Sequence, residues 1–170
     1  MPRECRMARP EDYPAIGRML ELYQYELSDI WDQELDSRGE FGYDTSKHQQ
    51  AQRFFAHVLL VEQHHAGFAL VAPAKVTQLD GFWMEQFFVL KRYRKAGNGL
   101  ALARHVFQSH VGAWEVGQMP ANTAARQFWR SVVAEVTQGD FVEVEVAQGW
   151  WKGTVQRFTI ESRSKNGSNA

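Results

Sequence analysis

Residues 94–99, Arg-Lys-Ala-Gly-Asn-Gly, place basic side chains and two glycines directly before a predicted helix. A buried apolar strand, residues 82–90, leads into this segment, and the helical pattern of Leu100, Ala103 and Phe107 follows it. The first N–H groups of a helix lack partners within the helix and carry partial positive charge, so they bind phosphate readily. Glycine has no Cβ and lets a ligand approach the backbone closely. The segment therefore predicts a phosphate-binding loop.

Two common nucleotide-binding motifs fit this loop poorly. Leu102 stands where the third glycine of a G-x-G-x-x-G motif belongs, and the apolar run places no acid at the ribose position. No Gly-Lys-Ser/Thr occurs in the chain, so a Walker P-loop fits less well still. A tight strand-to-helix connection with a solvated basic surface is the simpler alternative.

The elements that must hold this loop follow from the apolar periodicity. After Pro10, the residues Ile16, Met19 and Leu20 recur at the spacing of a helix lying on a core. Ser46, with Gln49 three positions later, predicts a capping box at a second helix. Strands are expected over residues 3–8, 58–61, 68–72, 82–90, 114–119, 141–147 and 155–160, and helices over 10–27, from 46 through Ala51, Phe54, Phe55 and Val58, over 100–111 and from 122 through Val132.

The apolar runs at residues 58–61 and 68–72 predict a hairpin whose connection is residues 62–67. His64 and His65 lie in that connection. Adjacent residues of a turn point in different directions and no third ligand is apparent, so we expect no metal site. In the last connection, Trp150 and Trp151 either line a substrate entrance or cover a sheet edge.

Composition describes one ordinary globular domain. The chain has 170 residues, 44% of them hydrophobic, and a formal net charge of −1, which favours neither nucleic acid nor an anionic membrane. Cys5 is the only cysteine, the first residues lack the apolar region that is typical of a signal peptide, and no apolar stretch reaches the length needed to cross a membrane. We expect a single domain over residues 1–160, a polar, disordered tail over 161–170, and a cytoplasmic location.

Two motifs carry a resemblance to a known family. Residues 87–89 (Phe-Phe-Val) followed by 93–100 (Tyr-Arg-Lys-Ala-Gly-Asn-Gly-Leu) are similar to the signature of the GNAT superfamily of acetyltransferases. Downstream, residues 122–129 (Asn-Thr-Ala-Ala-Arg-Gln-Phe-Trp) resemble that family's second motif, and residues 9–12 (Arg-Pro-Glu-Asp) resemble its N-termini. The resemblance implies an α/β (α+β) fold with about four helices and a mixed sheet of about six to seven strands, splayed between the fourth and fifth.

The same resemblance implies acetyl-CoA as cosubstrate, no metal, and direct attack of a primary amine on the thioester. Backbone groups of the fourth strand would pair with the pantetheine arm, the loop amides would hold the pyrophosphate, and Asn122 would lie beside the arm while capping its helix. The implied cofactor-binding residues are Phe88, Val89, Arg94, Lys95, Ala96, Gly97, Asn98, Gly99, Leu100 and Asn122.

Direct transfer needs a neutral amine, and a carboxylate can serve as the base that deprotonates it. Glu85 is the first candidate, because burial within an aromatic strand would raise its pKa toward neutrality. Its alternative role is that of a surface-facing or ion-paired strand residue. Glu115, on the neighbouring predicted strand, is the second candidate.

The general acid departs from the family pattern. Trp129 occupies the position where many GNAT enzymes have a tyrosine that protonates the thiolate, and an indole cannot replace it. Solvent, Tyr23 or Tyr25 are the substitutes that the sequence offers.

Residues 28–45 carry six acids against one base. They predict either a solvated loop or an acceptor side that favours cationic amines. The acceptor is expected to be a small-molecule or peptide amine, and the sequence leaves open whether the chain is a homodimer. A GNAT-like module that binds acyl-CoA or a partner without turnover is the alternative to an enzyme.

Overall fold

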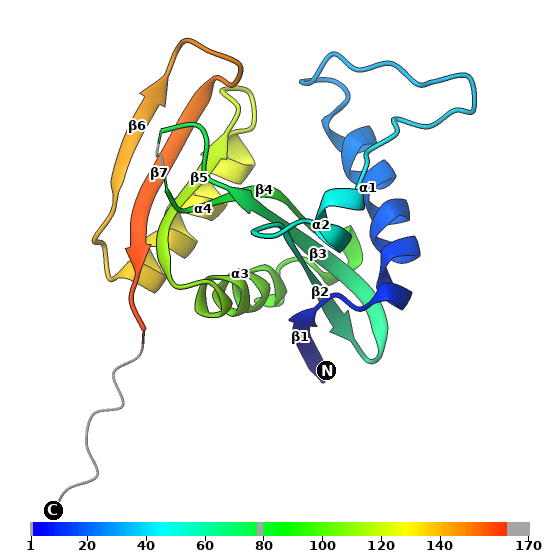
Figure 1. Ribbon diagram of the computed structural model, residues 1–170, viewed down its shortest axis with the longest axis horizontal. Coiled ribbons are helices and arrows are strands. Elements are labelled where there is room, and N and C mark those ends of the chain that lie inside the picture. Colours follow the sequence, from blue (N-terminus) through cyan, green and yellow to red (C-terminus); the bar gives the residue numbers. More distant parts are fainter. Residues whose placement is uncertain (1, 78–79, 163–170) are drawn as a thin grey trace, which may run out of the picture.

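The computed structural model describes residues 2–77 and 80–162 (Figure 1). Within them, seven strands form one sheet with four α-helices and two 3-10 helices around it. The strands are β1 (Arg3–Met7), β2 (Phe55–Val61), β3 (His64–Pro73), β4 (Phe82–Val89), β5 (Gly112–Gln118), β6 (Val142–Val146) and β7 (Gly153–Ile160); the helices are η1 (Pro10–Asp12), α1 (Tyr13–Leu27), α2 (Ser46–Gln50), η2 (Lys91–Tyr93), α3 (Asn98–Ser109) and α4 (Thr123–Thr137).

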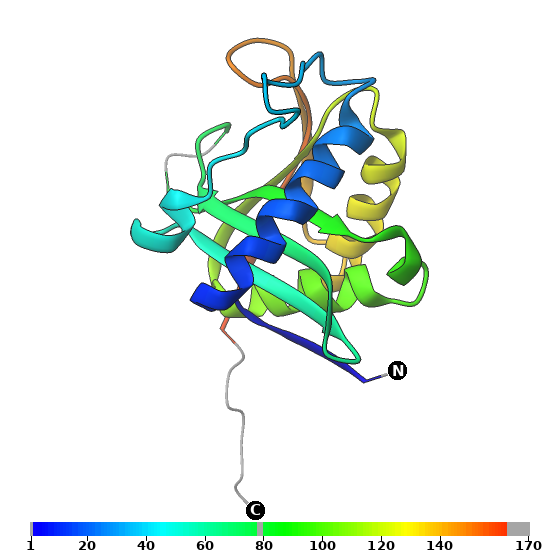
Figure 2. The ribbon, with the colours of Figure 1, turned by 90° about the vertical axis from the view of Figure 1, so that its right-hand side faces the viewer.

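The sheet has the strand order β1-β2-β3-β4-β5-β7-β6, and every neighbouring pair is antiparallel except β4 and β5. Helices α1 and α2 cover one face, and α3 and α4 cover the other (Figure 2). The predicted mixed α/β fold is therefore confirmed. Among the described residues, no helix is both long and apolar enough to cross a bilayer.

Strands β4 and β5 diverge along their length. They pair only at Phe82 with Trp114 and at Trp83 with Glu115, whereas β3 follows β4 as far as Val89. On its other side, β5 stays paired with β7 from Gly112 to Gln118. The sheet thus opens between its fourth and fifth strands, as predicted (Figure 1).

A β-bulge interrupts β4 beside the opening. Leu70 of β3 pairs with Gln86, but the next residue, Val71, pairs with Met84, so Glu85 has no partner on β3. A bulge bends its strand and redirects the side chain of the extra residue. The local backbone therefore determines where the Glu85 carboxylate points.

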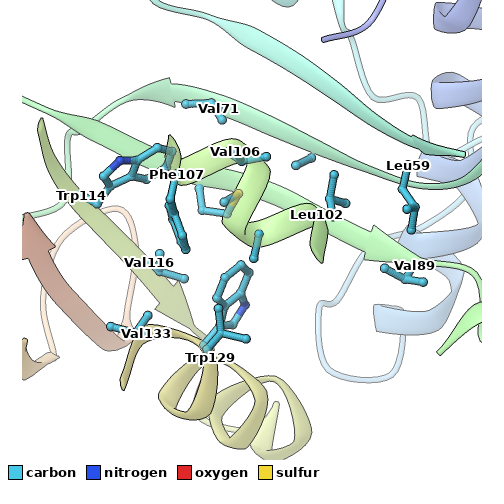
Figure 3. Packing of buried hydrophobic residues seen from close by; sticks show 14 of the residues in the cluster. Leu59, Val71, Val89, Leu102, Val106, Phe107, Trp114, Val116, Trp129 and Val133 are labelled. Atoms are coloured by element: carbon cyan, nitrogen blue, oxygen red, sulfur yellow. The ribbon is translucent and has the colours of Figure 1, made fainter. Parts of the chain in front are cut away.

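Two apolar cores fix the helices on the sheet. On one face, Leu102 and Phe107 of α3 and Trp129 of α4 are buried against β4 and β5 (Figure 3). On the other face, Ile16 and Leu20 of α1 lie in a second buried cluster with residues of β2, β3 and β4. Both N-termini of α3 and α4 are consequently held at fixed positions relative to the opening.

The helix predicted from Ser46 through Val58 is wrong in extent. Helix α2 ends at Gln50, Ala51 is exposed, and Phe55 already belongs to β2. Arg53 takes a positive φ of 66°, which no helix allows. The run of β-branched and apolar residues that follows satisfies both helical and strand patterns, and the sheet determines the outcome.

The hairpin is confirmed, but its connection is shorter than predicted. Glu62 and Gln63, both at positive φ, form the two-residue turn, as hairpins of this length prefer. His64 and His65 therefore begin β3, and His65 Nε2 lies 2.8 Å from the Asp12 carboxylate. Residues 163–170 of the predicted disordered tail lie outside the described residues.

Three histidines, His57 of β2, His105 of α3 and His110 directly after α3, lie in contact with one another. His57 of β2 places Nδ1 3.2 Å from His105 Nε2 and its own Nε2 2.8 Å from His110 Nε2. His57 turns one ring nitrogen toward each neighbour, so the rings do not converge on a shared point. Burial, with the neighbouring histidines, lowers the pKa of His57 to about 3 and that of His110 to about 4.

We expect this histidine cluster to make stability fall between about pH 6.5 and pH 4.5. The unfolded chain binds protons at an ordinary histidine pKa of about 6.5, while the folded imidazoles stay neutral, so acid favours unfolding. Carboxylates such as Asp12, whose pKa the Arg6 guanidinium lowers, act only at lower pH. Thermal melts should show a falling Tm across this window and a smaller fall in His57→Gln. A constant Tm from pH 7.5 to 4.5 would contradict the assignment.

Candidate active site

A cavity of about 1110 Å³ occupies the opening between β4 and β5. Its walls come from residues 83–89 of β4, the end of β5, the loop before α3 and α4 from its first turn as far as Glu135. The end of α1, the segment between α1 and α2, and the connection between β6 and β7 complete it. Segments far apart in the sequence therefore converge on the predicted site.

The loop before α3 has the geometry of an anion-binding turn. Lys95 and Gly97 both have positive φ, and α3 begins at Asn98. The Asn98 side chain is buried and donates from Nδ2 to the Tyr93 carbonyl at 2.8 Å, so it holds the loop. The first N–H groups of α3, which have no partner within the helix, thus follow a turn whose shape is held by the Asn98 side chain. Among the predicted loop residues, those that line the cavity are Arg94, Lys95, Gly97, Gly99 and Leu100, whereas Ala96 and Asn98 are not part of the lining.

Arg94 positions the loop. Its guanidinium donates two hydrogen bonds to the Glu26 carboxylate, at 2.8 and 2.7 Å, and its Nε donates to the Val89 carbonyl at 2.7 Å. The hydrogen bond to Glu26 raises the pKa of Arg94. Because a carboxylate of α1 already pairs with this cation, Arg94 joins α1 to the end of β4, which the sequence motif does not reveal.

The two strand residues predicted to contact the pantetheine arm differ in their backbone directions. Leu90 N–H donates to the Ala66 carbonyl of β3. Since backbone groups alternate sides along a strand, those of Phe88 also face β3, and those of Val89 face the opening. Val89 therefore keeps the predicted orientation, and the backbone of Phe88 belongs to the sheet.

Asn122 caps α4 as predicted. Its Oδ1 accepts a hydrogen bond from Ala125 N–H at 3.2 Å, and residues 121–125 line the cavity. The N-termini of α3 and α4 therefore both border the opening, and both carry partial positive charge. This end of the cavity suits a phosphate-bearing ligand.

Glu85 lies at the cavity wall with its side chain 19% exposed. Its Oε2 is 2.7 Å from Nε2 of His48, a buried residue of α2. The other ring nitrogen of His48 is buried and has no partner in the described structure. His48 thus makes one side-chain hydrogen bond, to Glu85, and orients that carboxylate.

The pKa of Glu85 lies below its usual value. Burial acts to raise this pKa. The His48 hydrogen bond, the charge of Lys75 and the Tyr43 hydroxyl act to lower it, and together they outweigh burial. The prediction that burial brings Glu85 toward neutrality is therefore wrong, because the sequence does not show these partners. At neutral pH the site presents a carboxylate, an acceptor for an amine proton.

Glu115 has a structural role instead of the catalytic one considered from the sequence. Its carboxylate is fully buried and accepts hydrogen bonds from the N–H groups of Lys75, Val76 and Thr77 and from the Thr77 hydroxyl, at 2.7–2.8 Å. It is not part of the cavity lining. The carboxylate holds the start of the connection between β3 and β4.

We expect Glu115→Ala to lower the free energy of unfolding by about 3 kcal/mol or more. Each buried N–H group left without an acceptor costs about 1–3 kcal/mol. Thr77→Val removes a single hydroxyl donor and should cost about 1 kcal/mol. Urea unfolding of both variants measures the difference, and equal costs would show that the carboxylate does not organise this connection.

The two tyrosines considered as general acids differ in their position relative to the cavity. Tyr23 lines the cavity, and burial raises its pKa to about 12, whereas Tyr25 is 73% exposed and is not part of the lining. Trp129 contacts Phe87 with ring centroids 4.8 Å apart and is 5% exposed. Trp129 thus forms a wall of the cavity as well as part of the core. Tyr43, raised in pKa by burial and by the charge of Glu85, stays a protonated neighbour of that carboxylate.

The acidic segment, residues 28–45, uses several of its carboxylates to fold. Asp36 accepts hydrogen bonds from the N–H groups of Arg38 and Glu40, and Asp44 accepts them from the N–H and the hydroxyl of Ser46. Among its six acids, Asp29 alone is part of the cavity lining. The charge of the segment is therefore largely directed away from the site.

Among the described residues, no group of three His, Cys, Asp or Glu side chains is arranged to hold a metal ion. Sequence reasoning did not single out His48, Lys75 or Glu26. None of them belongs to a recognisable motif, and only long-range folding brings each to the site.

The sequence matches no protein-family model, and a search of curated proteins gave no match. Solved structures are similar in fold. The ribosomal-protein-S18-alanine N-acetyltransferase of Escherichia coli covers 99% of this chain over 100% of its own length, with 16% identity and a TM-score of 0.63. The PaiA N-acetyltransferase of Thermoplasma acidophilum, in complex with coenzyme A, covers 94% over 99% of its own length, with 10% identity and a TM-score of 0.65.

A Streptococcus pneumoniae acetyltransferase of the GNAT family covers 94% of this chain over 100% of its own length, with 15% identity and a TM-score of 0.56. The chain therefore has the fold of the GNAT acetyltransferases. The predicted resemblance and the splayed sheet agree with this fold.

Proposed function

We propose that this protein is an acetyl-CoA-dependent N-acetyltransferase acting on a primary amine. The observation that carries the proposal is one cavity with two helix N-termini at one end and the Glu85 carboxylate on its wall. The helix N-termini can bind the phosphates of a thioester cosubstrate, and the carboxylate can accept the proton of an amine nucleophile.

Acetyl-CoA fits this cavity as a substrate. The N–H groups between Lys95 and Leu100 would hold its pyrophosphate, and the positive charge of Lys95 would add to them. The pantetheine arm would lie in the opening, beside the backbone of Val89 and the first turn of α4. The similar fold of a protein in complex with coenzyme A supports this placement.

The reaction balances without a covalent enzyme intermediate. The amine nitrogen attacks the thioester carbonyl, an N–C bond forms, and the C–S bond breaks. The proton lost by the amine passes to Glu85, directly or through water, and the departing thiolate takes a proton from solvent. Holding the two substrates together converts a bimolecular step into a local one.

The expectation of a cationic acceptor from the acidic segment has limited support, since only Asp29 of that segment lines the cavity. The alternative of a non-catalytic acyl-CoA-binding module is favoured by Trp129 in the position of the usual tyrosine. Such a module would bind the thioester but would not need Glu85.

Acetyl-CoA consumption in the presence of a panel of primary amines tests the proposal. We expect release of free coenzyme A thiol that depends on the amine, with formation of the N-acetyl product by mass spectrometry. Binding of acetyl-CoA without amine-dependent release, across amino acids, alkylamines, polyamines and peptides, would favour the binding module instead.

A further inference from the structure

Four aromatic side chains line the same cavity as Glu85, and we call the part of the cavity that they form with Glu85 the acceptor side. Tyr43 comes from the segment between α1 and α2, Trp83 from β4, and Trp150 and Trp151 from the connection between β6 and β7. Aromatic walls with a few polar groups are typical of sites for small molecules with an apolar body.

The side chains of Trp83 and Trp151 pack against each other and against Gly117. Their ring centroids lie 5.4 Å apart at 78°, with the rings meeting edge to face. Both rings press on Gly117 of β5: a Cβ there would lie 2.5 Å from Trp83 and 2.7 Å from Trp151. Glycine at this position lets the two indoles form a continuous apolar wall at the end of the opening.

Lys75 places one cation beside Trp150, which precedes Trp151 of this wall in the chain. Its Nζ lies 5.2 Å from the Trp150 ring centroid, and no ion pair joins it to a carboxylate within residues 2–77 and 80–162. The acidic groups nearby have other partners: Glu115 is occupied by backbone donors, and Glu85 by His48. The acceptor side therefore offers one exposed cation, one carboxylate and an apolar wall.

We propose that the acceptor is a free α-amino acid with an aromatic or large apolar side chain. This inference rests on the proposed acetyltransferase function. The α-amine would face Glu85, the carboxylate would pair with Lys75, and the side chain would lie against Trp83 and Trp151. A polyamine would meet repulsion from Lys75, and a protein N-terminus has no carboxylate next to its amine.

Kinetics with matched acceptors test the inference: phenylalanine and tryptophan against phenethylamine and tryptamine, which lack only the carboxylate, and spermidine. We expect kcat/KM to be at least about tenfold higher for the amino acids, after comparison at equal concentrations of free amine. Lys75→Met should remove that preference, because it should lower kcat/KM for the amino acids about tenfold more than for phenethylamine and tryptamine. Lys75→Arg, which keeps the charge, should retain it.

A binding readout separates this inference from the proposed function. With saturating coenzyme A, phenylalanine should raise the Tm of the wild type further, and should fail to do so in Lys75→Met. Turnover that is equal or faster with phenethylamine or spermidine would overturn the inference and leave the acetyltransferase proposal intact. An absence of turnover with every amine would overturn the proposed function, and the inference with it.

Discussion

Glu85→Gln is expected to lower kcat by about a hundredfold or more while leaving the affinity for acetyl-CoA within about twofold. Positioned general bases contribute about 10²–10⁴ in rate. The substitution keeps the size of the side chain and its place at the bulge of β4, but an amide cannot accept the amine proton. Because Glu85 lies away from the phosphate-binding end, cosubstrate binding should not change.

The pH dependence should identify which group titrates. Glu85 has a lowered pKa and is already a carboxylate above its usual value, so its protonation removes activity only in more acidic solution. The rise in kcat/KM toward alkaline pH should instead follow the amine, and it should persist in Glu85→Gln. Tyr23, with a pKa of about 12, should cause no fall near pH 10.

Full pH–rate profiles of wild type and Glu85→Gln, with acetyl-CoA affinity measured in parallel, check this prediction. The matched control is Glu143→Gln, a carboxylate of β6 that pairs with Arg130 outside the cavity lining. A Glu85→Gln enzyme within about threefold of the wild type would mean that proximity alone accounts for catalysis.

Gly97→Val and Gly99→Val are each expected to abolish the rise in Tm that coenzyme A produces. Gly97 has φ of 73°, where valine is strained, and a Cβ at Gly99 would lie 3.1 Å from the Phe128 ring. Either change displaces the start of α3, whose N–H groups are the proposed phosphate ligands. In the wild type, coenzyme A at about 100 times its Kd should stabilise by about 2.7 kcal/mol.

Gly139→Val provides the control for backbone strain. Gly139 follows α4, has φ of 84° and open space around its Cβ position, so the substitution costs stability without touching the loop. Thermal melts of the three variants with and without coenzyme A should show a normal shift in Gly139→Val alone. A normal shift in Gly97→Val and Gly99→Val would exclude the loop from the site.

The strands, the loop and the helix cap were predicted because each depends on local patterns, whereas the opening between β4 and β5 was expected only from the resemblance to a known family. The apolar, aromatic run of β4, the glycines before α3 and the cap at Asn122 act over a few residues. The C-terminal end of α2 could not be predicted, since the apolar pattern of the residues after Gln50 suits a helix as well as a strand. Pairing with β1 and β3 decides it.

The site was predicted less completely, for a physical reason. The partners of Glu85, Glu115 and Arg94 are His48, the backbone of residues 75–77 and Glu26, which lie 37 or more positions away in the chain. Such contacts determine the protonation, burial and role of each group. Residue type and spacing alone therefore suggested two candidate bases where the fold provides one.

A crystal structure with coenzyme A bound tests the central claim most directly. The account predicts the pyrophosphate on the N–H groups at the start of α3, the pantetheine arm between β4 and β5, and the thiol on the side of the cavity that holds Glu85. Coenzyme A bound outside this opening, or with its thiol directed away from Glu85, would contradict it.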